Sequence, residues 1–153
     1  KVLREPVSFA FKKWIYPMRN LFCLIVCLPL ALSAQYRLEV EALGVESSEG
    51  SILVAAYTEA SGFLKMEQVY QTAGSRATQG MTRVVFEDLP EGDYALAVFH
   101  DENGNDELDT NWIGIPKEPF GFSNARMKTF GPPKFEDCVI SLRADQVIQI
   151  PLE

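Results

Sequence analysis

Side chains that end in oxygen alternate along the segment DENGNDELD, which spans residues 101–109. They stand at positions 1, 3, 5 and 9 of this segment and are Asp101, Asn103, Asn105 and Asp109. Calcium takes six to eight oxygen ligands at about 2.3–2.6 Å, and alternate residues of a tight loop turn their oxygens toward one centre. We therefore expect an EF-hand-like calcium loop, with the backbone carbonyl of Glu107 as a further ligand and Leu108 packed on the core.

The segment departs from an EF-hand at two positions. Position 6, usually Gly, is Asp106, and position 12, usually a bidentate Glu, is Trp112. A predicted strand rather than a helix leads into it, so the expectation is a calcium loop on a β scaffold. The missing carboxylate would come from Asp106, Glu118 or Glu136 by folding back. The alternative is an ion-free loop whose side chains accept hydrogen bonds from their own backbone.

His100 is the only histidine in the chain. With Asp101 or Asp109 it could form a general base, so a hydrolase-like enzyme is the alternative function. No G-x-S-x-G or H-E-x-x-H motif and no second histidine for a zinc site accompanies it. A structural histidine, hydrogen-bonded to loop backbone, is the interpretation we prefer. We expect a non-enzymatic binding module, and a purely structural protein whose loop only covers the sandwich is a further alternative.

Residues 101–135 form one long predicted loop that is rich in aromatic and apolar residues. Loops of this length are usually functional or disordered, and this composition favours an ordered loop that packs on the domain. A bound ion at residues 101–109 would order residues 110–135. Trp112, Phe120 and Phe122 would then either anchor the loop in the core or form a platform for a sugar or a peptide. The expected partner surface is His100, Trp112, Phe120, Phe122 and Asn124.

The beginning of the chain resembles a leader. Met18 is the first Met, Arg19 is basic, residues 21–32 are an apolar run of 12, and small residues follow. This order is typical of a secretory signal peptide, and the run is short for a membrane span. We expect an upstream extension at residues 1–17, a signal peptide at 18–34 and one domain at 35–153, exported to the periplasm or secreted.

The predicted domain is strongly acidic. Removing five basic residues and one acidic residue with the leader leaves 9 and 20 of the 14 and 21 in the chain, a net charge of −11. Such a surface repels nucleic acid and anionic membranes and attracts cations. Cys138 is the single cysteine left, so no internal disulfide forms, and a buried thiol is the expected state.

Strand patterns dominate the rest. Residues 36–42 alternate apolar and charged, whereas residues 51–57 and 94–100 are apolar on both faces and predict central strands. Residues 61–71 predict a short helix or structured loop, and residues 72–80 a mobile loop. Further strands are expected at residues 82–89, 137–142 and 146–152, the last two as a pair. The prediction is all-β: a single antiparallel β-sandwich of six to seven strands with one long ordered loop.

Residues 89–142 carry specific motifs: H-D-x-N-G-N, L-D-x-N, G-I-P-K-E-P-[FY]-G-F-S-N and G-P-P-x-F-E-D. With them the chain resembles the bacterial DUF2141 family of secreted proteins of unknown function. The family usually has Gly where this chain has Asp106, which adds an acidic group beside the expected ion. The resemblance implies an exported β-sandwich similar to transthyretin-like or carboxypeptidase-regulatory-like modules, which share the L-P-x-G-x-Y turn. It implies no reaction and identifies no partner. A protein or a glycan of the cell envelope is the class of partner that we consider.

Overall fold

The computed structural model describes residues 34–129 and 131–153. The expected extension at 1–17 and signal peptide at 18–34, apart from Ala34, lie outside the described residues, as do Cys23 and Cys27. None of the helices in the described ranges has the length and apolar character needed to cross a membrane.

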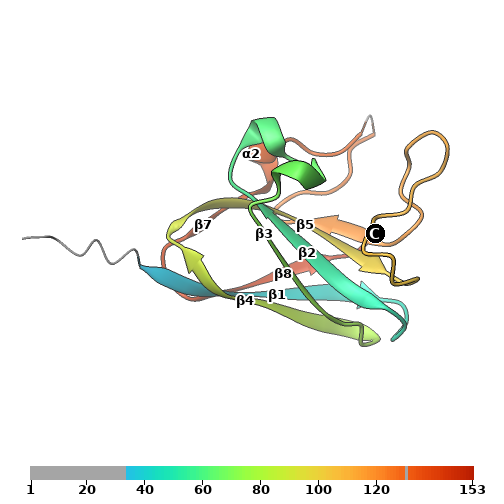
Figure 1. The fold of residues 1–153 in the computed structure, drawn as a ribbon, viewed down its shortest axis with the longest axis horizontal. Helices are drawn as coiled ribbons and strands as arrows, with labels where there is room; N and C mark the ends of the chain where they lie inside the picture. Colours follow the sequence, from blue (N-terminus) through green and yellow to red (C-terminus); the bar gives the residue numbers. More distant parts are fainter. Residues whose placement is uncertain (1–33, 130) are drawn as a thin grey trace, which may run out of the picture. The chain divides into compact units, whose positions relative to one another are not determined.

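The described residues form eight strands in two sheets (Figure 1). One sheet has the order β4-β1-β8, and the other has the order β3-β2-β5-β6, with β7 also paired to β5. The predicted all-β sandwich is confirmed, with eight strands instead of six or seven. The strands are β1 (Gln35–Val45), β2 (Ser51–Tyr57), β3 (Gln71–Arg76), β4 (Gly80–Pro90), β5 (Gly92–Asp101), β6 (Phe120–Phe122), β7 (Val139–Leu142) and β8 (Gln146–Pro151).

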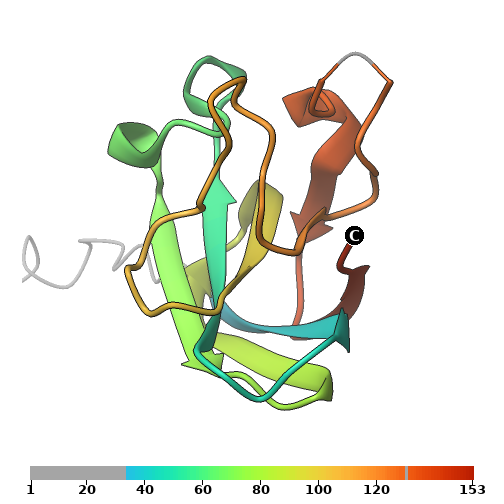
Figure 2. The same ribbon diagram turned by 90° about the vertical axis from the view of Figure 1, so that its right-hand side faces the viewer.

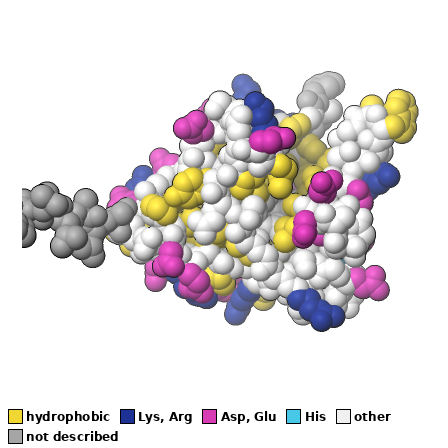
Figure 3. All heavy atoms as spheres, viewed as in Figure 1, with side chains coloured by type: hydrophobic (Ala, Val, Ile, Leu, Met, Phe, Trp, Pro, Cys, Tyr) yellow, Lys and Arg dark blue, Asp and Glu magenta, His cyan; other side chains and the backbone are white. Residues whose placement is uncertain are grey.

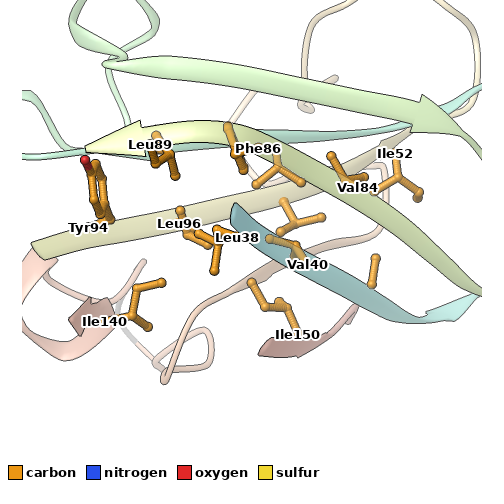
Figure 4. Close-up of a cluster of buried hydrophobic side chains, with 14 of the residues drawn as sticks. Leu38, Val40, Ile52, Val84, Phe86, Leu89, Tyr94, Leu96, Ile140 and Ile150 are labelled. Atoms are coloured by element: carbon orange, nitrogen blue, oxygen red, sulfur yellow. The ribbon is translucent and has the colours of Figure 1, made fainter. Parts of the chain in front are cut away.

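The main core lies between the two sheets. Successive side chains of a strand point to opposite faces, so alternate residues of β1, such as Leu38 and Val40, are fully buried. Apolar side chains from β1, β2, β4, β5, β7 and β8 meet there (Figure 4). On the solvent-exposed face of the β4-β1-β8 sheet, Glu39 and Glu41 of β1 form ion pairs with Arg83 of β4.

A second, smaller cluster covers the outer face of the β3-β2-β5-β6 sheet. Ala95, Phe122 and Cys138 are its buried members, and Phe63 and Phe135 pack against them. Phe135 and Cys138 lie in the short helix α2 (Phe135–Cys138), and Phe63 directly follows the 3-10 helix η1 (Ala60–Gly62). A second 3-10 helix, η2 (Met66–Gln68), comes shortly after η1. The short helix or structured loop predicted for residues 61–71 corresponds to η1 and η2.

Two predictions about the C-terminal strands are wrong. The segments 137–142 and 146–152 do not pair, because β7 joins β5 and β8 joins β1 in the other sheet. The β1–β8 pair is parallel, so the sandwich is not purely antiparallel. Arg143, between them, donates to the carbonyl of Gly92 and to Asp93 at 2.7 and 2.9 Å, which ties the end of β7 to β5 before the chain crosses over.

The prediction of a mobile loop at residues 72–80 is also wrong, because most of these residues lie in β3 and at the start of β4. Half-buried Gln71, Ala73 and Ser75 alternate with exposed Thr72 and Gly74 along β3. The alternation is that of a strand, but its inward side chains are small or polar. Hydrophobic periodicity therefore gives a weak signal here.

Candidate functional site

Strand β5 delivers His100 and Asp101 to one end of the second sheet, where they point to opposite faces. Asp101 is 1% exposed. The turn between β1 and β2 passes close to Asp101, since a Cβ on Gly50 would lie 1.9 Å from the carbonyl oxygen of Asp101. Gly50 also has a φ of +66°, so both space and conformation demand glycine at this contact. The beginning of the 101–109 segment is therefore held rigidly against the sandwich.

The Asp101 carboxylate organises the loop that follows. Its Oδ1 accepts hydrogen bonds from the backbone N–H groups of Gly104 and Asn105 at 2.7 and 3.2 Å. Its Oδ2 accepts one from the N–H of Asp106 at 2.9 Å. These bonds compensate the burial of a charged group and wrap the backbone around it. They also require the left-handed conformation of Asp106, with a φ of +61°, at the position where an EF-hand usually has Gly.

Asn103, Asn105 and Asp109 converge on one another. The Nδ2 atoms of Asn103 and Asn105 lie 2.7 and 3.5 Å from the two oxygens of the Asp109 carboxylate. Their Oδ1 atoms accept the N–H groups of Asn105 and Glu107, respectively, at 3.0 and 2.9 Å. Three of the four side chains predicted to share one centre therefore meet, whereas the Asp101 carboxylate binds backbone N–H groups instead. The hydrogen bonds themselves are those of the ion-free alternative, a loop capped by its own side chains.

Glu118, which lies outside the 101–109 segment, joins the two ends of that segment. It is 8% exposed, and its two oxygens accept the N–H groups of Glu102 at 3.2 Å and Asp109 at 2.9 Å. Of the three carboxylates expected to fold back, Glu118 therefore contacts both ends of the segment. Asp106 lies in the segment itself, and Glu136 lies in α2.

The candidate site carries negative charge. Among residues 34–129 and 131–153, no Lys or Arg pairs with the carboxylates of Asp101, Asp106, Asp109 or Glu118. In the same residues no group of three or more His, Cys, Asp or Glu side chains is placed to hold a metal ion. A cation at this loop would therefore depend on amide and backbone oxygens in addition to carboxylates.

His100 does not face a cleft. Its side chain is fully buried on the core side of β5, and its Nε2 lies 2.8 Å from the carbonyl oxygen of Glu49. Its Nδ1 lies 3.8 Å from Glu102 Oε1 and has no hydrogen-bond partner among the described residues. This is the structural histidine that the sequence favoured. The hydrolase alternative needed an open wall at His100, and the geometry does not provide one.

Residues 110–116 fold back as a small hairpin, visible in the orange loop of Figure 2. Asn111 holds it, because its backbone N–H donates to Ile115 at 2.8 Å and its Oδ1 accepts the N–H groups of Ile113 and Ile115 at 2.9 and 3.0 Å. The apolar tip points outward, with Trp112 93% exposed, Ile113 62% and Ile115 56%. The expectation that the apolar residues of this loop anchor it in the core is therefore wrong for the tip.

Phe120 and Phe122 do serve as anchors. They lie in β6, which pairs with β5 inside what the sequence predicted as one uninterrupted loop, and their rings are 5.7 Å apart. Phe122 is buried in the second cluster, and Asn124 donates from Nδ2 to the carbonyl of Val139 at 2.7 Å. The five residues expected to form one partner surface are thus distributed between the core, β6 and the hairpin tip. Only Trp112 and Asn124 among them are exposed.

A family model described as "Uncharacterized protein conserved in bacteria (DUF2141)" matches residues 40–150. The match covers seven of the eight strands completely or nearly so, together with the whole 101–118 segment. No curated protein and no solved structure matches the chain.

Proposed function

Because the chain belongs to the DUF2141 family of uncharacterized bacterial proteins, we propose its function from the geometry of residues 101–118. The proposal is an exported, non-enzymatic β-sandwich module that binds calcium at this loop. Its side-chain ligands would be Asp101, Asn103, Asn105 and Asp109, with the backbone carbonyl of Glu107. The bound ion would stabilise the segment that carries the hairpin at residues 110–116.

The observation that carries this proposal is the convergence of two amides on the Asp109 carboxylate. In the described conformation the Nδ2 atoms of Asn103 and Asn105 approach Asp109. A half-turn of each amide would give up the hydrogen bonds that its Oδ1 accepts from Asn105 or Glu107, and would turn that oxygen toward Asp109. The result would be a group of oxygens that suits a hard cation. The Asp101 carboxylate has used three of its roughly four acceptor positions, so it retains capacity for one more contact.

The negative charge of the loop favours a bound cation over an ion-free state. The carboxylates of Asp101 and Glu118 are almost fully buried and accept backbone N–H groups from residues 102–109, the stretch that also contains Asp109. A divalent cation would relieve the repulsion between them more effectively than amide dipoles do. The net charge of −7 for the whole chain further favours cation uptake.

The consequence of ion binding would lie at the hairpin. Asp109 and Glu118 flank residues 110–116, so an ion beside Asp109 would fix both legs of the hairpin. A fixed hairpin presents Trp112 at low entropic cost to a protein or glycan partner of the cell envelope. The leader pattern at residues 18–34 supports the exported location.

The test is calcium titration of the purified protein by calorimetry, with thermal unfolding in calcium and in chelator. The informative variant is Asp109→Asn, because it removes a charge while keeping the shape and the backbone bonds of Asp101. Asp101→Ala is less informative, since it also removes three hydrogen bonds that shape the loop. Asp88→Asn, an exposed carboxylate at the end of β4, is the matched control.

We expect saturable heat and a rise in melting temperature with the wild-type protein and with Asp88→Asn. Linkage predicts about 2.7 kcal/mol of added stability at a free calcium concentration 100 times Kd. Asp109→Asn should weaken binding by about tenfold or more, since a charged ligand is replaced by a neutral one. No heat and no thermal shift in the wild-type protein would reject calcium binding.

A further inference from the structure

The outer face of the second sheet contains a hollow of about 370 Å³ between η2 and the 101–109 loop. Its volume falls in the usual range for ligand pockets, roughly 300–1,000 Å³. Its lining includes Leu53 and Ala55 of β2, Thr72 and Gly74 of β3, Phe99 of β5, Met66 of η2 and Asp106 of the loop.

Small residues keep this part of the sheet open. A Cβ on Gly74 would lie 2.6 Å from Cδ2 of Leu53, so the absence of a side chain on β3 lets Leu53 lean across it. Phe99 is 8% exposed and contributes an apolar wall. Farther along the same face, Phe63 and Phe122 pack over Ala95, so the second cluster covers the sheet there. The hollow is therefore the part of this apolar face that remains accessible.

The charge at the rim selects a basic occupant. Asp106 is exposed and borders the hollow, and its backbone is held by the N–H bond to Asp101 Oδ2 at 2.9 Å. Figure 3 shows hydrophobic side chains over the region of β2 and β3, with carboxylates to their right. An apolar floor beside a fixed carboxylate is complementary to a ligand that joins an apolar group to a cation.

Strand β3 supplies the backbone for an extended occupant. Within the described residues β3 pairs only with β2, so it forms the edge of its sheet. An edge strand offers N–H and C=O groups to which an extended chain can add, while neighbouring pockets receive alternate side chains. Thr72 and Gly74 line the hollow from this edge.

We propose that β3 and the adjacent hollow bind an extended segment of another protein. The segment adds to β3 as a strand, places an apolar side chain against Leu53 where Leu53 reaches over Gly74, and directs a Lys or Arg two residues away toward Asp106. This inference goes beyond the calcium proposal, because it needs only a fixed Asp106, which the Asp101 carboxylate already provides. Calcium at the same loop would further restrict Asp106 but is not required.

The test uses three fluorescein-labelled, end-blocked hexapeptides with the pattern Leu-Ser-X-Ser-Leu-Ser, where X is Lys, Gln or Glu. Alternate side chains of an extended peptide share one face, so Leu and X point together toward the hollow. Fluorescence anisotropy is measured with the wild-type protein in calcium and in chelator. We expect the Lys peptide to bind at least tenfold more tightly than the Glu peptide, with the Gln peptide between them.

Two variants and their matched controls locate the site. Asp106→Asn keeps a residue type that tolerates the left-handed conformation and should abolish the preference for Lys over Gln. Thr72→Lys places a cation in the hollow and should weaken the Lys peptide by at least tenfold. Asp88→Asn on β4 and Thr58→Lys after β2 make the same chemical changes at exposed positions outside the hollow and should leave binding unchanged.

Absence of binding by all three peptides, or a Lys preference that survives both Asp106→Asn and Thr72→Lys, would overturn the inference. The outcome is distinguishable from that of the calcium proposal. A Lys preference in chelator without calcium heat keeps this inference and rejects the ion. Calcium heat without any peptide preference keeps the ion and rejects this inference.

Discussion

Asp101 and Glu118 are carboxylates placed where solvent scarcely reaches, and both are paired with backbone N–H groups. Asp101 accepts three such bonds and Glu118 accepts two. Hydrogen bonds to an ionised group are stronger than those between neutral groups and offset much of the desolvation cost. Each residue therefore fixes backbone rather than presenting a free charge, and Asp109 remains the residue whose charge can be tested without rebuilding the loop.

Cys138 provides a pH test at the scale of one residue. Burial, together with a smaller contribution from the neighbouring Asp137 carboxylate, raises the pKa of its thiol from 9.0 to about 11. Between about pH 9 and 11 the unfolded chain releases this proton while the folded chain retains it. Stability is therefore unaffected well below pH 9 and falls as pH rises through this window.

The measurement is the free energy of unfolding by denaturant at pH 8 and pH 10.5, under reducing conditions. The wild-type protein should lose up to about 2 kcal/mol more than Cys138→Ala between the two values. The alanine variant carries every other titrating group, so it isolates the thiol. Equal losses in the two proteins would show that the thiol does not titrate abnormally.

At the scale of secondary-structure elements, the turns between strands determine where the candidate site lies. The turn from β1 to β2 passes over the end of β5, and Gly50 allows it to touch the backbone of Asp101. Gly80, at the start of β4, also has a positive φ of +92°, but a Cβ there would meet nothing within 4 Å. The two glycines therefore differ in packing while sharing the conformational demand.

Gly50→Ala should destabilise the protein by about 2 kcal/mol or more beyond the cost of Gly80→Ala. Left-handed strain of about 1–2 kcal/mol is common to both, and the clash with Asp101 is specific to the first. Denaturant unfolding of the two variants measures the difference. If both cost the same, the turn can move away from β5, and the close approach is not needed for the fold.

At the scale of the whole molecule, β8 and the residues after it connect the two sheets. This strand lies beside β1 in parallel register, and the backbone groups of Glu153 exchange hydrogen bonds with Phe120 of β6 at 2.8 and 3.3 Å. The end of the chain thereby connects the first sheet to the edge of the second. Ile150 is fully buried between them, whereas Val147 on the same strand is 58% exposed.

Ile150→Ala should lower the free energy of unfolding by about 2–5 kcal/mol, because it leaves a cavity in the core. Val147→Ala should cost less than about 1 kcal/mol, since its side chain is already in solvent. The pair compares two apolar truncations on one strand by denaturant unfolding. Similar costs at both positions would contradict the placement of β8 against the core.

The sequence alone determined the features that depend on neighbouring residues. The apolar run of β2, the alternation of β1 and the Pro-Glu-Gly-Asp turn before Tyr94 each specify local backbone, and the strands were predicted there correctly. The spacing of Asp101, Asn103, Asn105 and Asp109 likewise predicted a polar loop with a shared centre. The structure brings Asn103, Asn105 and Asp109 together, whereas the Asp101 carboxylate accepts backbone N–H groups.

Only the tertiary structure decided the features that depend on competition between distant segments. A strand such as β8 has the same local pattern whether it pairs with β7 or with β1, so its partner follows from which pairing buries Ile150 and Leu142 in one core. Glu118 contacts the loop because β6 returns the chain to β5. Trp112 is exposed because the hydrogen bonds of Asn111 close the hairpin before its tip reaches the sandwich. No local periodicity encodes these long-range choices.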